Sequence, residues 1–318
     1  MKKTLTLVAM ALALSSNAFA WPDKTITLVV PFPAGGATDA LARTLTPKLQ
    51  EKLKQNVIVD NKAGATGTIG AGFVKRAPAD GYTLLVTSLG PLVIAPYLLA
   101  KVPYEASKDF DYLTVAVQAP NVLVVPASSP YKTMAELIAA EKANPGKLFF
   151  ASVGTGTSDH LSAELFWLQS GTSGLHVPYK GAAPAITDLL GGQVDAAFQN
   201  INNVLPHITA GKLRVLAIAA PKRSPLLPNV PTLTESGVKD ADATSWQGVV
   251  APKGLPPAVK AQIHAALMDA LADPAVKQKF AEVGFEMVAN TPEQFAAYQA
   301  SEAARWKKLI ETRKIAVD

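Results

Sequence analysis

Two short loops of this sequence combine glycine with hydroxyl residues at points where a helix is expected to begin. The first loop spans residues 31–39 and the second spans residues 152–160. Glycine lets the backbone approach a ligand closely, and the free N–H groups of a helix N-terminus bind anionic oxygens. The loops therefore predict a site for a small anion, although each also fits an ordinary strand-to-helix turn with a cap. The candidate ligand-binding residues are Pro33, Ala34, Gly35, Gly36, Ala37, Thr38 and Asp39 in the first loop, and Gly154, Thr155, Gly156, Thr157, Ser158 and Asp159 in the second.

Further candidates lie where expected strands end. Ser88 ends one strand, Tyr179 follows a second, and the amides of Gln199 and Asn200 follow a third. In open α/β sheets, ligands bind beyond the carboxyl ends of the strands, so these side chains are placed to meet the two loops. Lys180 could pair with an anion, but an exposed lysine on a turn is the simpler interpretation.

The sequence has no strong pattern typical of a catalytic or metal site. Ser158, Asp159 and His160 supply the three residue types of a hydrolase triad, but neighbours on a helix diverge by about 100° and cannot form a relay. A secreted serine hydrolase would have to combine Ser158 or Ser88 with a remote histidine, and no Gly-x-Ser-x-Gly elbow is present. The sequence also lacks the spacing of a zinc or calcium site. We therefore expect no enzyme activity, no metal and no cofactor.

Short apolar runs alternate with helical segments along the chain, which predicts mostly parallel sheets flanked by helices. Continuous runs such as Leu28–Val30 indicate strands buried on both faces. Pro47 lies within the first expected helix, 39–54, and should kink or split it. The expected strands are 25–30, 57–60, 83–87, 113–117, 122–125, 148–151, 175–177, 194–198, 214–219 and 248–251, and the other expected helices are 67–76, 134–143, 158–169, 182–190, 201–209, 257–271, 274–282 and 292–312.

The N-terminal segment has the pattern of an export signal. Lys2 and Lys3 precede a short apolar run, and Ala18-Phe19-Ala20 has the small-x-small pattern of a cleavage site. We therefore expect a cleaved signal peptide at 1–20 and a periplasmic mature protein. Two segments could cross between lobes, 110–126 and 245–252, the latter with Trp246 either covering a ligand or packing in a hinge. The expected division is lobe 1 at 21–119 plus 243–318 and lobe 2 at 120–242, with a ligand cleft between them.

Composition excludes several classes of protein. The chain of 318 residues has no cysteine, so thiol nucleophiles, cysteine-zinc sites and disulfides are absent. The net charge of +5 is spread along the chain, which argues against nucleic-acid binding.

Several motifs in the same order resemble one family, the periplasmic solute-binding proteins of tripartite tricarboxylate transporters, known as the Bug family. The resemblance covers nearly the whole mature chain. Its carriers are residues 30–39, 61–72, 79–85, 154–161, 177–181 and 205–208.

The resemblance implies a two-lobed fold similar to a type II periplasmic binding protein, in which each lobe is a mostly parallel sheet flanked by helices. It also implies capture of a mono- or dicarboxylate by backbone and hydroxyl donors of the two loops, carried here by 34–39 and 154–158. The expected partners are the membrane components of a tripartite transporter, or a sensor kinase if the same cleft serves a two-component system. We expect a monomer. Asp159 and Gln199 are positions where relatives differ, so they are candidates for setting ligand preference.

Overall fold

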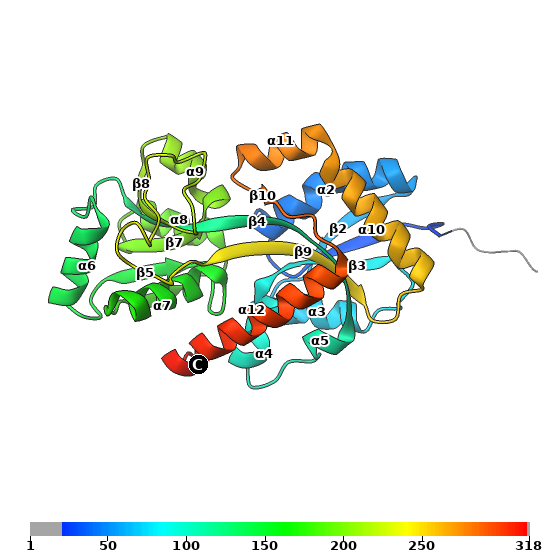
Figure 1. The fold of residues 1–318 in the computed structure, drawn as a ribbon, viewed down its shortest axis with the longest axis horizontal. Coiled ribbons are helices and arrows are strands. Elements are labelled where there is room, and N and C mark those ends of the chain that lie inside the picture. Colours follow the sequence, from blue (N-terminus) through cyan, green and yellow to red (C-terminus); the bar gives the residue numbers. More distant parts are fainter. Residues whose placement is uncertain (1–20, 317–318) are drawn as a thin grey trace, which may run out of the picture.

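The computed structural model describes residues 21–316 and shows a two-lobed α/β fold, as the sequence predicts (Figure 1). Each lobe contains one part of the sheet with helices packed against it, and the two parts are continuous through one long strand. The expected signal peptide at 1–20 lies outside the described residues. Within 21–316, no helix is long and apolar enough to cross a bilayer.

The sheet of lobe 1 begins with three parallel strands. The apolar runs of the first and third strands along the chain are buried on both faces, whereas the second strand, at the edge of the sheet, is partly exposed. Strand β1 (Ile26–Val30) pairs in parallel with β2 (Val57–Asn61) and with β3 (Thr83–Ser88). The sheet continues through β9 (Thr244–Pro252) and β4 (Phe110–Pro126), and a short strand, β10 (Glu286–Met287), pairs with β4. The strands that cross between lobes run antiparallel to their neighbours.

The sheet of lobe 2 is built around the distal part of β4. Strands β7 (Ala196–Asn200) and β8 (Leu213–Ala219) flank β4 on either side and run antiparallel to it. Strand β5 (Phe149–Ser152) then pairs in parallel with β7 and with β6 (Leu175–Pro178). The carboxyl ends of β5, β6 and β7 each lead into a helix, which is the arrangement that places ligands in open α/β sheets.

The clearest difference from the sequence prediction lies in one long strand. Residues 110–126 form a single strand, β4, where two strands, 113–117 and 122–125, were expected. Pro120 is tolerated because it lies where β4 leaves its lobe 1 partners and Asn121 begins pairing with β7 and β8. Together β4 and β9 join the two lobes (Figure 1). The residue boundaries of the lobes remain a prediction.

All nine expected helices are present with similar bounds, and proline marks the start of three of them. Two short helices, Ala95–Leu98 and Ala106–Asp109, were not expected. Thr291 caps the long last helix in a capping box with Gln294, and Asp273 caps the helix before it. Pro47 does not split the first helix, in which the Thr46 hydroxyl donates to the Ala42 carbonyl at 2.8 Å. The helices are α2 (Ala37–Leu53), α3 (Thr68–Lys75), α4 (Ala95–Leu98), α5 (Ala106–Asp109), α6 (Met134–Ala143), α7 (Ser158–Ser170), α8 (Ala182–Leu190), α9 (Ile201–Thr209), α10 (Pro257–Ala272), α11 (Pro274–Glu282) and α12 (Pro292–Arg313), with short 3-10 and π turns η2 (Ala65–Gly67) and η3 (Gly90–Ile94).

Three of the four tryptophans, Trp167, Trp246 and Trp306, are buried in the core. Trp246 on β9 is fully buried and packs edge-on against Phe295 of α12, with ring centroids 5.5 Å apart. Of the two roles expected for Trp246, the structure therefore shows packing at the lobe crossing. Helix α12 lies along the crossing strands and reaches toward lobe 2 (Figure 1).

Candidate ligand-binding site

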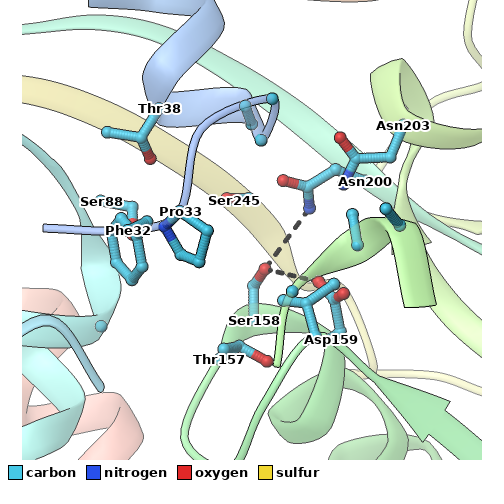
Figure 2. Close-up of a pocket in the computed structure, with 18 of the residues that line it drawn as sticks. Phe32, Pro33, Thr38, Ser88, Thr157, Ser158, Asp159, Asn200, Asn203 and Ser245 are labelled. Carbon is cyan, nitrogen blue, oxygen red and sulfur yellow. Dashed lines mark hydrogen bonds between the residues drawn. The ribbon is translucent and has the colours of Figure 1, made fainter. Parts of the chain in front are cut away.

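A cavity of about 220 Å³ lies between the lobes, and both glycine-rich loops line it. Figure 2 shows Pro33, Thr38 and Ser88 on one side facing Thr157, Ser158 and Asn200 on the other. The lining is mainly apolar, with hydroxyl and amide groups placed among the apolar atoms. This combination is typical of a small-molecule site.

On the lobe 1 side, β1 leads through a tight loop into α2. Gly35 has a φ of 87°, in the left-handed region that glycine adopts without strain. Gly36 is the N-cap of α2 and has no side chain to satisfy the first turn. The N–H groups of Ala37 and Thr38 have no acceptor within the helix, so they are available to a ligand.

Asp39 is turned away from the cavity and holds the loop. Its carboxylate accepts from the Gly35 N–H at 3.0 Å, from Arg43 Nε at 2.8 Å and from Asn61 Nδ2 at 3.0 Å. Burial acts to raise the pKa of Asp39, but the hydrogen bonds from Arg43, Gly35 and Asn61 outweigh it and hold that pKa below 3.8. Asp39 is therefore an ionised anchor that fixes the backbone of the loop.

On the lobe 2 side, three helices begin at the cavity within the described part of the chain. The lining includes Thr157 and Ser158 at the start of α7, Gly181–Ala183 at the start of α8, and Asn200 at the start of α9. The N-caps of these helices make no side-chain capping bond. With α2 opposite, four helix N-termini therefore converge on one cavity, and their dipoles favour a negative ligand.

The polar groups of lobe 2 form a connected network beside the cavity. Asn200 Nδ2 donates to Asn121 Oδ1 and lies 3.4 Å from Ser158 Oγ. Ser158 Oγ in turn lies 3.1 Å from Asp159 Oδ1 (Figure 2). Ser162 accepts from Asn121 Nδ2 at 2.7 Å, which fixes the amide orientation. The Ser158 hydroxyl is therefore held between an amide donor and a carboxyl group.

Asp159 differs from Asp39 in that no cation of residues 21–316 lies beside it. Asp159 is 2% exposed, and its Oδ2 atom has no hydrogen-bond partner in the described part of the chain. Burial raises the pKa of Asp159 to about 7. The hydrogen bond from Ser158 and those from the backbone N–H groups of Val153 and of Asp159 itself only partly oppose this rise. The only other ionisable residue among those that line the cavity is Lys180, whose side chain is exposed.

Most of the residues predicted from the sequence line the cavity. Asp39, Gly154, Thr155, Tyr179 and Gln199 do not. The Gly154 carbonyl accepts from the Thr157 hydroxyl at 2.7 Å, the Thr155 carbonyl accepts from Thr66, and the Tyr179 hydroxyl donates to Asp188. Gln199 is fully buried with its amide unpaired. The predicted residues that line the cavity are Pro33, Ala34, Gly35, Gly36, Ala37, Thr38, Ser88, Gly156, Thr157, Ser158, Asp159 and Asn200.

Sequence reasoning did not single out several lining residues. Ser245 and Gln247 lie on β9 and are nearly fully buried, with the Gln247 amide donating to Ser245 Oγ at 2.9 Å. They follow no glycine loop, and only their place on a crossing strand could have indicated them. The start of α8 could have been found by the strand-glycine-helix rule that identified the other loops. The missed residues are Phe32, Leu89, Gly90, Val153, Gly181, Ala182, Ala183, Pro184, Asn203, Ser245 and Gln247.

The histidine nearest to Ser158 in sequence makes other contacts. His160 Nδ1 accepts from the Gly156 N–H at 3.2 Å, and its ring stacks on His176 with centroids 3.8 Å apart. Burial, with the charge of His160, lowers the pKa of His176 to about 3. Ser158 and Asp159 do hydrogen-bond despite the expected divergence of neighbours, because Asp159 Oδ1 turns back to Ser158 Oγ. No histidine lines the cavity among residues 21–316.

The lobes touch next to the cavity. Thr66 Oγ1 of lobe 1 donates to the Thr155 carbonyl at 3.1 Å, and Arg313 Nε of α12 donates to Glu164 of α7 at 2.8 Å. A Cβ on Gly156 would lie 2.4 Å from Leu98 of lobe 1. The second loop therefore fits closely against lobe 1.

The fold and the cavity between its lobes define a two-lobed binding protein. Residues 41–315 match the family described as the tripartite tricarboxylate transporter family receptor, TctC, and the chain belongs to this family of solute-binding receptors. Protein BugT of Bordetella pertussis is 40% identical over 295 residues, covering 92% of this chain and 90% of BugT.

Solved structures show the same architecture. A protein of Rhodopseudomonas palustris solved with adipate superposes with a TM-score of 0.89 at 35% identity, covering 93% of this chain and 99% of its own. MatC of Rhodopseudomonas palustris, solved with malate, superposes with a TM-score of 0.86 at 32% identity. The match covers 91% of this chain and 100% of MatC. The periplasmic binding protein BugD superposes with a TM-score of 0.87 at 35% identity, and the match covers 93% of this chain and 99% of BugD.

Proposed function

We propose that this protein is exported to the periplasm, captures a small mono- or dicarboxylate between its lobes, and presents it to the membrane components of a tripartite tricarboxylate transporter. It binds the acid without chemical change. The observation that carries the proposal is the convergence of four helix N-termini from both lobes on one cavity.

Neutral donors can hold a carboxylate in this cavity. N–H groups at a helix N-terminus are oriented before the ligand arrives and carry partial positive charge, so they can replace an arginine. Hydroxyls of Thr38, Ser88 and Ser158 lie around the same space (Figure 2). The relatives solved with adipate and malate, both dicarboxylates, support this class of ligand. A hydrolase would need a histidine at the serine, and the position of His160 gives no support for one.

The proposal is tested by thermal unfolding of the mature protein with a panel of mono- and dicarboxylates. A bound acid at 100 times Kd stabilises the folded state by about 2.7 kcal/mol. A panel in which no acid raises the melting temperature would overturn the proposal.

A matched pair of variants on α2 locates the site. Thr38→Val removes a hydroxyl that lines the cavity and should weaken binding by roughly 2- to 10-fold, the value of one hydrogen bond. Thr46→Val changes a hydroxyl on the same helix that bonds the Ala42 carbonyl, and should leave Kd unchanged. Equal affinities of the two variants would place the ligand elsewhere.

A further inference from the structure

Asp159 is an unusual group to find beside a site for anions. It lines the cavity, it is 2% exposed, and its Oδ2 atom has no partner. An ionised carboxylate in this position would repel a carboxylate ligand and would be buried without a compensating cation. Asp159 must therefore change either the ligand that is accepted or the protonation state in which it is accepted.

The neighbouring hydroxyl shows which of these applies. Ser158 has one hydroxyl proton, and its oxygen lies 3.1 Å from Asp159 Oδ1. If Asp159 is ionised, it can only accept, so Ser158 donates to it and offers lone pairs to the cavity. If Asp159 is protonated, it donates to Ser158, and the Ser158 proton becomes free to point at a ligand oxygen.

Asn200 cannot accept the Ser158 proton, so it does not orient this hydroxyl as a donor. Its Nδ2 lies 3.4 Å from Ser158 Oγ and is a donor, because Asn121 Oδ1 accepts from the same nitrogen. Ser158 therefore has no acceptor on the Asn200 side that could take its proton. The proton of Asp159 alone decides whether Ser158 presents a donor or an acceptor to the ligand.

We propose that Asp159 is a positioning residue that takes up one proton from the solvent when the protein binds a carboxylate, so that Ser158 becomes a hydrogen-bond donor to the ligand. The inference rests on the proposed function, since it concerns the same cavity and the same class of ligand. No covalent bond forms or breaks. One proton moves from water to the Asp159 carboxylate, and one carboxylate enters the cavity.

The charged groups around Asp159 do not supply an alternative partner. On its own helix, His160 bonds the Gly156 N–H and Glu164 pairs with Arg313. His176 on β6 bonds Ser152 Oγ at 2.6 Å, and Lys180 before α8 is exposed. Across the cavity on α2, Asp39 and Arg43 form an ion pair with each other at 2.8 Å.

The direction of the pH dependence follows from linkage. Burial already raises the pKa of Asp159 to about 7, and a bound carboxylate raises it further because like charges disfavour ionisation. Below about pH 7 the free protein already holds the proton, so affinity is highest and does not depend on pH. Above that value each further pH unit should weaken carboxylate binding by roughly tenfold, until the pKa of the complex is reached.

The test is titration calorimetry of the mature protein with adipate and with malate, between about pH 5.5 and 8.5, in phosphate and in Tris buffers. Near pH 8, the wild type should take up close to one proton per ligand, seen as a buffer-dependent enthalpy. Asp159→Asn keeps a permanent donor toward Ser158 and should bind with a Kd that is independent of pH and without proton uptake.

Glu141→Gln is the matched control. Glu141 is another buried carboxyl of lobe 2 whose pKa is raised by burial, but it accepts from Trp167 in the core and does not line the cavity. This variant should keep the pH dependence of the wild type. Wild-type binding without proton uptake and with a constant Kd overturns this inference and leaves the proposed function standing. If no acid of the panel, adipate and malate included, binds the wild type or Asp159→Asn at any pH, both fail.

Discussion

The two loops that meet across the cavity are built from the same residue types, yet their acidic residues behave in opposite ways. Asp39 and Asp159 both lie in the first turn of a helix that follows a glycine-rich loop. Asp39 turns back to Arg43, Asn61 and the loop backbone and stays ionised. Asp159 faces the cavity network with a hydroxyl as its only side-chain partner, and its pKa rises to about 7.

The comparison shows that a carboxylate at a helix N-terminus has no fixed role. The helix dipole favours the ionised form at both positions. The two positions differ in their cationic neighbour. Arg43 lies one turn along α2 and pairs with Asp39, whereas no cation of the described residues takes the corresponding place beside Asp159. One loop is therefore held by charge, and the other can change its hydrogen-bonding character with one proton.

The largest effects are expected when each carboxyl is neutralised. Asp159→Asn should stabilise the fold at pH 8 by about 2–4 kcal/mol, because the raised pKa of Asp159 makes the wild type lose stability as pH rises from 3.8 through about 7. The gain should vanish toward pH 4. Urea unfolding at several pH values measures both the gain and its pH dependence.

Asp39→Asn should destabilise the fold by about 1–3 kcal/mol at neutral pH, because Gly35 and Arg43 lose a charged acceptor. The lowered pKa of Asp39 means that this difference persists above pH 3.8 and disappears only as pH falls below it. If Asp39→Asn and Asp159→Asn changed the free energy of unfolding in the same direction at pH 8, the contrast between the two loops would be wrong.

The next largest difference is expected between alanine substitutions of the two loop glycines, in their effect on ligand affinity. Gly156→Ala places a Cβ 2.4 Å from Leu98 and 3.1 Å from Thr66, both of lobe 1, at a φ of 73°. It should hold the lobes apart and weaken ligand binding by roughly 10- to 100-fold, or about 1.4–2.7 kcal/mol. Gly35→Ala meets open space and should cost only about 1 kcal/mol of stability from its φ of 87°. Calorimetric Kd values for the pair test this, and equal losses of affinity would contradict it.

The smallest effect is expected at the contact between α12 and α7. Arg313→Gln removes the ion pair with Glu164, a part-buried contact between lobes. We expect a loss of about 0.5 kcal/mol or less in unfolding free energy, reduced further by salt. Thermal unfolding at low and high ionic strength measures it. A loss that is unchanged by salt would mean that packing, and not charge, holds α12 against lobe 2.

Much of the fold could be predicted because its signals are local. Helices α10, α11 and α12 each begin at a proline, and the apolar runs of β1 and β3 mark buried strands. Strand β4 was divided in the prediction because residues 118–121, which include Pro120, interrupt its two apolar runs. At this point its continuity depends on Thr244, the partner of Pro120, and on Asn200, the partner of Asn121, which lie far along the chain and which no local pattern contains.

The site could be predicted only in part, for a similar reason. A glycine loop before a helix identifies backbone donors, so the residues from Pro33 to Thr38 were found. The direction of a side chain depends on tertiary partners, and Asp39 turns away because Asn61 lies beside it in the neighbouring strand β2. Ser245 and Gln247 face the cavity because β9 passes beneath it, which is a property of the assembled sheet.

The path of β4 has a consequence for how the molecule denatures. Its first part lies between β9 and β10, and its last part lies between β7 and β8, so each sheet has the same chain segment among its inner strands. If one sheet unfolds, β4 loses part of its hydrogen-bond partners, and β4 is also an inner strand of the other sheet. Heat capacity should therefore show one cooperative peak for the whole protein, with equal calorimetric and van't Hoff enthalpies, although the molecule has two lobes.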